Sequence, residues 1–367
     1  MSEDFIDVLG LQLREAGARQ RSRGPLARAI AATRAALLHY ALAPALATLT
    51  AAAILAAAVY EVTHLRPEPA AQRAPKVVMR FSPAAGLGQM VVGFGSVWLD
   101  DTNRNQLLRM DPDNHGVTAR IPVRGDAAVT ISDDAVWVIE SPGGAFTRAG
   151  PLLRIDPRTN RVVARIPLRT RSGAPFLGWD VRSDSGITWI IGPRGALRVE
   201  ARTNRITHTI DIGSRYELSD AVLSGSDLWV LVNDGRLLRY DALTGARKGI
   251  AHVPVTGNLT TSGRAIYLLN TTGVARLDPA SGRLLWRSSR QVGAESSGVA
   301  TAANGLLWVP TRVPRHPGLR IVGLHPKTGR VIADTPTVQE FDATSLARVG
   351  SDLWMATNSG HVLVIRP

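Results

Sequence analysis

The sequence predicts an all-β body preceded by a single membrane-spanning helix. Three observations support this prediction: an aromatic motif that recurs along the body, a turn motif that follows most copies of it, and one long uncharged segment near the N-terminus. The 367-residue chain also holds 34 glycines and 22 prolines, which favours many turns and short strands over long helices.

The aromatic motif is a β-rich stretch with a central tryptophan that follows a small or turn residue. It occurs seven times, with spacings of 39, 52, 40, 38, 41 and 46 residues. A period near 40 residues matches a four-stranded blade, so the repeat predicts a seven-bladed β-propeller over residues 76–367. We expect the seven aromatic side chains to pack between neighbouring blades: Trp98, Trp137, Trp189, Trp229, Tyr267, Trp308 and Trp354.

The turn motif is clearest at residues 153–162, where Asp156 and Pro157 are followed by Asn160. Aspartate accepts backbone hydrogen bonds, proline fixes φ, and asparagine or glycine takes the left-handed position of a tight turn. The aspartates of this motif are therefore predicted to be structural, not catalytic acids or metal ligands.

A β-strand is predicted after each turn, but the seventh repeat ends with the chain at Pro367 and lacks it. Residues 76–83 align with residues 161–168, so that Lys76 matches Arg161. We expect this N-terminal strand to complete the seventh blade and close the ring, which protects the edges that an open array exposes.

On these motifs, residues 76–367 resemble the YVTN-repeat and virginiamycin B lyase-like propellers, whose blades carry Val-Trp-Val and then an Arg-Ile-Asp-Pro-x-Thr-Gly turn. Residues 277–286 also resemble the pyrroloquinoline-quinone repeat. The resemblance implies the propeller fold and, as an alternative function, a lyase or a quinone-dependent oxidoreductase. The lyase-like enzymes are expected to use a His/Glu/His cluster with magnesium, but no two histidines here have ligand spacing.

The uncharged segment spans residues 35–60, and its 26 residues exceed the ~20 that a bilayer-spanning helix needs. Six arginines precede it, which predicts a cytoplasmic N-terminus and an extracytoplasmic body. We therefore expect a basic cytoplasmic segment at 1–34 with a short amphipathic helix at 2–16, a transmembrane helix at 35–60 and a linker at 61–75. A cleaved signal peptide is the rival interpretation, but the apolar region and its leader are both long for one.

Composition narrows the possible functions. The absence of cysteine excludes disulfides, thiolate nucleophiles and Cys-ligated metals. Of the net charge of +13, residues 1–66 contribute +2 and the body +11. This excess is explained either by an arginine-rich bacterial composition or by attraction to an anionic partner, and the extracytoplasmic location argues against nucleic acid. Nucleophile-elbow, zinc-protease and phosphate-loop motifs are absent, so no catalytic residue, metal or cofactor is predicted.

In a propeller, loops between the second and third strands of a blade share one face with the loops between blades. The long segments 141–150, 169–178, 312–319 and 335–343 all belong to these two classes. We predict a non-catalytic binding, scaffold or sensor module for an envelope protein or an anionic polymer. The predicted partner face comprises Arg104, Arg148, Arg169, Arg171, Phe176, Arg194, Arg215, Tyr216, Arg312, Arg315, His316, Glu340 and Phe341.

Overall fold

The computed structural model describes residues 74–132, 134–143, 150–213, 215–253, 257–288, 292, 299–312, 318–340 and 342–367. The amphipathic helix, the transmembrane helix and nearly all of the linker predicted above lie outside these residues. Among the residues described, none forms a helix with the length and apolar character that a bilayer crossing needs.

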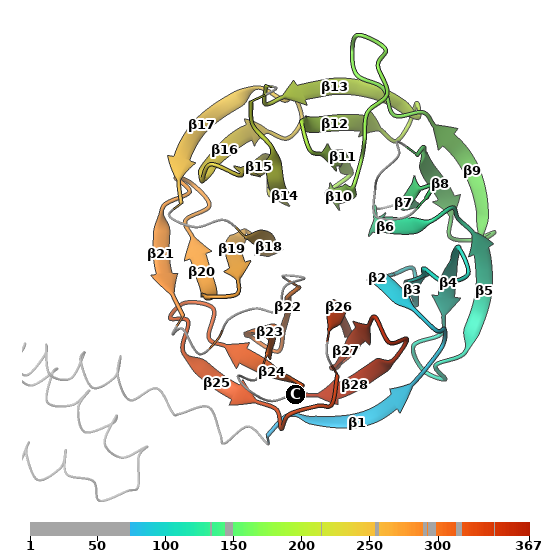
Figure 1. Cartoon of the computed structure of the whole chain (residues 1–367), viewed down its shortest axis with the longest axis vertical. Helices are drawn as coiled ribbons and strands as arrows, with labels where there is room; N and C mark the ends of the chain where they lie inside the picture. The colour runs from blue at the N-terminus through green and yellow to red at the C-terminus, as the bar shows by residue number, and fades with distance from the viewer. Residues whose placement is uncertain are drawn as a thin grey trace, which may run out of the picture. The chain divides into compact units, whose positions relative to one another are not determined.

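The described residues form seven four-stranded antiparallel sheets arranged as blades around a central axis (Figure 1). This confirms the predicted seven-bladed β-propeller. In blades 1 to 6 the chain runs from the innermost strand to the outermost strand. Blade 1 holds β2 (Leu87–Gly93), β3 (Ser96–Asp101), β4 (Gln106–Met110) and β5 (Val117–Pro122). Blade 2 holds β6 (Asp126–Ile131), β7 (Val136–Ser141), β8 (Leu152–Asp156) and β9 (Arg161–Ile166).

The next four blades repeat this order. Blade 3 holds β10 (Asp180–Asp184), β11 (Ile187–Gly192), β12 (Gly195–Glu200) and β13 (Arg205–Asp211). Blade 4 holds β14 (Leu218–Ser224), β15 (Asp227–Val232), β16 (Arg236–Asp241) and β17 (Arg247–His252). Blade 5 holds β18 (Asn258–Ser262), β19 (Ala265–Asn270), β20 (Gly273–Leu277) and β21 (Leu284–Arg287). Blade 6 holds β22 (Thr301–Ala303), β23 (Leu306–Arg312), β24 (Leu319–Leu324) and β25 (Val331–Asp334).

Blade 7 is built from both ends of the body. Its inner strands are β26 (Ala343–Val349), β27 (Asp352–Thr357) and β28 (Val362–Arg366), and its outer strand is β1 (Lys76–Phe81). Met79 pairs with Val364 in the position where Ala164 pairs with Arg154 in blade 2. The predicted alignment of residues 76–83 is therefore confirmed at the level of register, and β1 closes the ring (Figure 1).

The repeated aromatic residues form the core between blades, as predicted. All seven are at most 2% exposed. Trp189 of blade 3 packs in one cluster with Leu228 and Ala242 of blade 4, and its indole Nε1 donates to the Ala242 carbonyl at 2.9 Å. Burying both the ring and its polar atom across a blade junction fixes how far apart neighbouring blades lie.

The predicted turns are also confirmed. The Asp156 carboxylate accepts hydrogen bonds from the Arg158 backbone N–H and the Thr159 hydroxyl, both at 2.9 Å. These bonds lower the pKa of Asp156 below its usual value. Asn160 takes the left-handed conformation with φ of 57°. The aspartate is thus explained by turn geometry.

Arginines on the third strands of several blades form a second repeated contact between neighbouring blades. Arg154 pairs across the sheet with Trp137, stacks on its ring at 5.7 Å, and donates from Nη1 to the Ala201 carbonyl of the next blade at 2.9 Å. Matching residues in other blades donate in the same way to the next blade's turn. We call these four side chains the clasp arginines: Arg109, Arg154, Arg239 and Arg276. Part of the body's positive charge therefore holds the propeller together.

The junction between blades 7 and 1 replaces the clasp with aromatic contacts. Val364 occupies the clasp position on β28. His115, from the turn of blade 1, stacks on Trp354 with ring centroids 5.2 Å apart, and Phe81 of β1 meets the same indole edge-on at 5.4 Å. The closing strand is thus held by packing as well as by its backbone hydrogen bonds.

Candidate binding face

One end of the ring collects the predicted binding loops. Because the strands within a blade alternate in direction, β3–β4 type loops and blade-to-blade connections emerge at the same end. We call this end the insertion face. All four long segments predicted above belong to it, although residues 144–149, 313–317 and 341 lie outside the described residues. Arg148, Arg315, His316 and Phe341 fall there.

The channel wall next to this face is held by side chains that cross between blades. Inner strands have a free edge, and their backbone N–H groups need partners. The Gln89 amide oxygen accepts from the Val129 N–H at 2.7 Å, and the Ser345 hydroxyl accepts from the Met90 N–H at 3.1 Å. In each case the side chain comes from the preceding blade, so the polar residues lining the wall have a structural task.

Asp220, a buried aspartate, holds the next blade in the same way through its carboxylate. Asp220 of β14 accepts from the Leu259 N–H of blade 5 at 2.6 Å. It also lies near Arg182 of β10, whose Nη2 is 3.4 Å from Asp220 Oδ1 and 2.7 Å from Asp180 Oδ2. Burial raises the pKa of Asp180 to about 6 despite Arg182, with Asp220 adding to the rise. This trio couples blades 3 and 4 near the insertion face.

Blades 1 and 2 hold a second acidic group at the same end. Asp100 of β3 accepts from the Ala127 N–H at 3.0 Å, and Asp101 accepts from the Gln106 amide at 2.7 Å. Burial raises the pKa of Asp100 to about 7, with the charges of Asp126 and Asp101 adding to it. Asp100 Oδ1 and Asp101 Oδ1 have no hydrogen-bond partner among the described residues. Within that part of the chain, no three His, Asp or Glu side chains are arranged to hold a metal ion.

A charged cluster surrounds Glu340 in blade 7. Its carboxylate is 3% exposed and contacts Arg80 Nη2 at 2.8 Å, His361 Nδ1 at 3.0 Å and the Ser359 hydroxyl at 2.9 Å. A serine, a histidine and a glutamate in contact suggest a hydrolytic triad, in which the serine and the acid must meet opposite ring nitrogens. Here Ser359 and Glu340 both contact Nδ1. The cluster instead ties β1 to the insertion face through Arg80.

Two predicted face residues are not on the surface. Phe176 is 6% exposed and packs with Leu168 and Ile190 in the core between blades 2 and 3, because the loop closes at its base, where the Phe176 N–H donates to the Leu168 carbonyl at 2.9 Å. Glu340 is buried by the ion pairs just described. Neither side chain is available to a partner in this conformation, which corrects their assignment to the face.

Two other predicted residues are engaged with neighbours. Tyr216 is half-buried under Arg236, whose guanidinium lies 3.8 Å from the ring centroid. Arg312 is 60% exposed and its Nη2 pairs with Asp342 at 2.7 Å. Each of these two side chains therefore already contacts another residue of the chain, and a partner would bind it together with that residue.

The remaining predicted arginines are exposed and form an arc over blades 1 to 4 of the insertion face. A sixth exposed arginine, Arg124 in the β5–β6 connection, belongs with them and was not predicted. We call this set the arginine arc: Arg104, Arg124, Arg169, Arg171, Arg194 and Arg215. Most acids at this end are buried or half-buried, with Asp211, Glu217 and Asp234 exposed, and Asp234 pairs with Arg236 at 2.7 Å, so the arc gives the outermost surface over blades 1 to 3 a positive potential.

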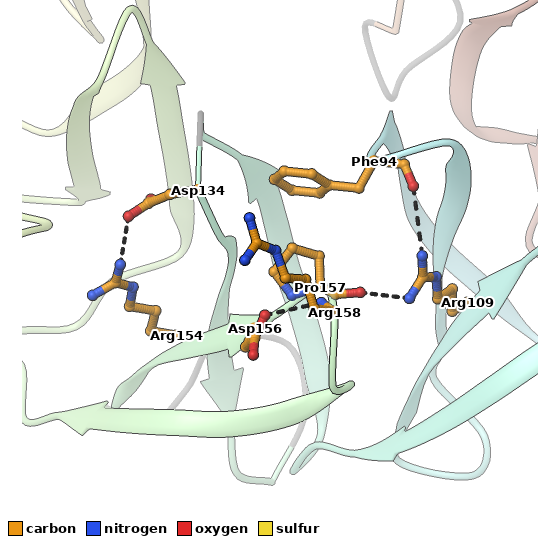
Figure 2. A pocket seen from close by; sticks show the side chains of 7 residues that line it. All are labelled: Phe94, Arg109, Asp134, Arg154, Asp156, Pro157 and Arg158. Atoms are coloured by element: carbon orange, nitrogen blue, oxygen red, sulfur yellow. Dashed lines mark hydrogen bonds and ion pairs between the residues drawn. The ribbon is translucent and has the colours of Figure 1, made fainter.

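The opposite end of the ring has a hollow of about 580 Å³ between blades 1 and 2 (Figure 2). Arg154 in its wall pairs with Asp134, and Arg109 donates to the Phe94 and Pro157 carbonyls. Both are clasp arginines, so these two charges of the hollow already hold blades together, whereas Arg158 in the same lining is exposed.

The fold and the site define a seven-bladed β-propeller with a basic, loop-bearing face. No protein-family model matches the chain, and no curated protein matches it. Among solved structures it is similar to virginiamycin B lyase from Staphylococcus aureus, with a TM-score of 0.61 and 14% identity over 80% of this chain and 99% of that one.

Two further solved structures are similar. BamB from Moraxella catarrhalis has a TM-score of 0.53 and 16% identity, covering 77% of this chain and 83% of that one. The Myceliophteria thermophila Cps50 (Swd1) β-propeller domain has a TM-score of 0.62 and 12% identity, covering 80% and 99%. At these identities the similarity establishes the fold alone.

Proposed function

We propose that this protein is a membrane-anchored, extracytoplasmic propeller that binds an anionic envelope partner through its insertion face and performs no catalysis. The observation that supports this function best is the arginine arc. Its side chains are exposed at the insertion face, and Arg169 donates from Nη1 to the Gly173 carbonyl of its own loop at 2.9 Å, whereas the clasp arginines bind the turns of neighbouring blades. Arginine is suited to such a surface because its planar fork pairs with carboxylates and phosphates.

The shape of the face favours an extended or broad partner. The arc spans four consecutive blades, while the groups nearest the channel are buried and hydrogen-bonded to backbone. A small ligand in the channel mouth would have to displace contacts that hold the inner strands. A protein with an acidic patch, or an anionic polymer, can instead lie across the loops.

The anchor follows from the sequence of residues 35–60, which is uncharged over 26 residues and has arginines on its N-terminal side. Protease treatment of intact cells stripped of their outer layers tests this part. Digestion of the body without digestion of an N-terminal tag is expected. Protection of the body would contradict the orientation.

Capture from solubilised envelope tests the binding function. The full chain, held in detergent micelles and immobilised, is expected to retain a partner at low salt and to release it as ionic strength rises, because exposed charge pairs are screened over about 8 Å at physiological salt. Retention that is insensitive to salt would contradict an electrostatic face. Retention of nothing by a folded chain would contradict binding itself.

A further inference from the structure

Exposed apolar side chains gather on one sector of the outer wall. Of the eleven large apolar side chains that are exposed among the described residues, seven lie on β21, β25 and β1. These are the outer strands of blades 5, 6 and 7, which follow one another along the rim (Figure 1). We call this set the apolar wall: Val77, Val78, Met79, Leu284, Leu285, Val331 and Ile332.

Matched positions on the other blades show that the sector is distinct. On each outer strand, one residue pairs with the clasp position of the third strand. The residue just before it is Leu285 in blade 5, Ile332 in blade 6 and Val78 in blade 7. In blades 1 to 4 the same position holds Thr118, Val163, Thr207 and Lys248. Val163 is isolated there, with Arg161 and Arg165 exposed beside it. Contiguous exposed apolar residues usually mark a surface that something covers.

Basic residues border the apolar wall. Lys76, Arg283 and Arg330 stand at or just before the start of its three strands, and Lys327 lies in the turn before β25. All four are exposed, and none forms an ion pair within the described part of the chain. Apolar side chains bordered by lysine and arginine match the chemistry of a bilayer surface, with its acyl chains beneath anionic headgroups.

With the proposed anchor, the short linker keeps this sector near the bilayer. β1 begins at Lys76, and the uncharged segment ends at Tyr60, so 15 residues separate them. Even fully extended, such a linker reaches only about 50 Å. A surface that is tethered this closely needs little intrinsic affinity to stay in contact with the bilayer.

We infer that the apolar wall rests on the lipid surface of the anchoring membrane, with its apolar side chains in the headgroup region and its basic border on anionic headgroups. The inference rests on the proposed anchoring. Because the three strands lie on a convex rim, Ile332 on the middle strand enters deepest, and Leu285 and Val78 on its flanks enter less. The ring axis then runs parallel to the membrane, and the insertion face is directed sideways, where a partner on the same membrane can reach it.

The absence of cysteine allows a clean test. Full-length Ile332→Cys carries a fluorescent label and is reconstituted into vesicles of phosphatidylcholine and phosphatidylglycerol that contain quencher-bearing lipids. Val163→Cys is the matched control, since it has the same register position on blade 2. The label at position 332 is expected to lose most of its fluorescence, and the label at position 163 to keep the fluorescence that it has in quencher-free vesicles. Labels attached in the same way at positions 285 and 78 are expected to lose less than the label at 332. Equal quenching of the labels at positions 332 and 163 by the lipids overturns the inference.

The same samples separate this inference from the anchoring on which it rests. Flotation of the vesicles reports whether the chain is membrane-bound at all. A chain that floats while its 332 label remains unquenched keeps the anchor and loses the wall contact. A chain that does not float overturns both. A third outcome is a label that is shielded from an aqueous quencher but is not quenched by the lipids. If this shielding disappears when the protein is diluted in lipid, the wall contacts a second copy of the chain, and the lipid contact is overturned.

Discussion

Replacing Asp100 by asparagine tests the energetics of the buried acidic group in blades 1 and 2. Asp100 is 1% exposed, and its only hydrogen bond within the described residues is the one that Oδ2 accepts from the Ala127 N–H at 3.0 Å. An asparagine of the same shape keeps a carbonyl oxygen for that bond and carries no charge. The substitution therefore removes ionisation while leaving the junction in place.

The pKa of Asp100 fixes the sign and size of the effect. Burial raises it from 3.8 to about 7, so the folded protein binds the proton more tightly than the unfolded chain does. The free energy of unfolding that Asp100 gains from this higher pKa in the folded state is fully present below about pH 4. It is lost as the pH rises towards 7. About three pKa units at 1.36 kcal/mol each give an upper limit of about 4 kcal/mol. We expect Asp100→Asn to match the wild type near pH 4 and to be more stable by up to that amount at pH 8.

Thermal unfolding of the full chain in detergent, followed by tryptophan fluorescence at pH 4 and pH 8, measures this difference. Asp113→Asn, at an exposed turn position, controls for the loss of a charge elsewhere. The Tm of Asp100→Asn should exceed that of the wild type at pH 8 and converge with it at pH 4. A Tm difference that is the same at both pH values, or a variant that is less stable at pH 8, would refute the reasoning.

The remaining predictions concern the blade junctions and the ring closure. Arg154→Met should destabilise the chain by about 2–3 kcal/mol in chemical unfolding, because the hydrogen bonds to Ala201 and Asn204 and the ion pair with Asp134 are lost. Exposed Arg158→Met should change stability by less than about 0.5 kcal/mol, and equal losses would argue against the clasp. Deletion of residues 76–81 removes β1 and exposes the edge of β28, so aggregation in size-exclusion chromatography is expected. A monomeric deletion variant with wild-type Tm would contradict ring closure by β1.

The fold was predictable because every blade repeats the same turn and aromatic residue. The alignment of Met79 with Ala164 held at the level of single residues, since both strands skip one residue in the pairing at the same place, Val78 in β1 and Val163 in β9. The clasp arginines were not predicted, although arginine recurs two residues before the turn aspartate in several blades. Their role depends on the distance between neighbouring sheets, which a one-blade pattern does not contain.

The binding face was predictable only in part. Loop class located five of the six arginines of the arc, but it could not tell that Phe176 folds into the core or that Glu340 is enclosed by Arg80 and His361. The first burial depends on where the hairpin of the loop closes, and the second on ion pairs with residues that are distant in the sequence. Asp180 and Asp220 were missed because they lie inside inner strands. The available signal was an aspartate at the start of β10 and another within the first three residues of β14.

The central claim is that the arginine arc binds an anionic envelope partner, and charge reversal tests it most directly. The test variant carries Arg104→Glu, Arg171→Glu and Arg215→Glu, three exposed arc residues on different loops. The matched control carries Arg158→Glu, Arg202→Glu and Arg247→Glu, which change the charge equally at the opposite end of the ring.

Both variants and the wild type are compared in binding to the same solubilised envelope, with Tm as a check of folding. The account predicts that the arc variant loses binding, whereas the control variant retains it. Equal binding by the two variants, with unchanged Tm, would contradict the claim that this face binds the partner.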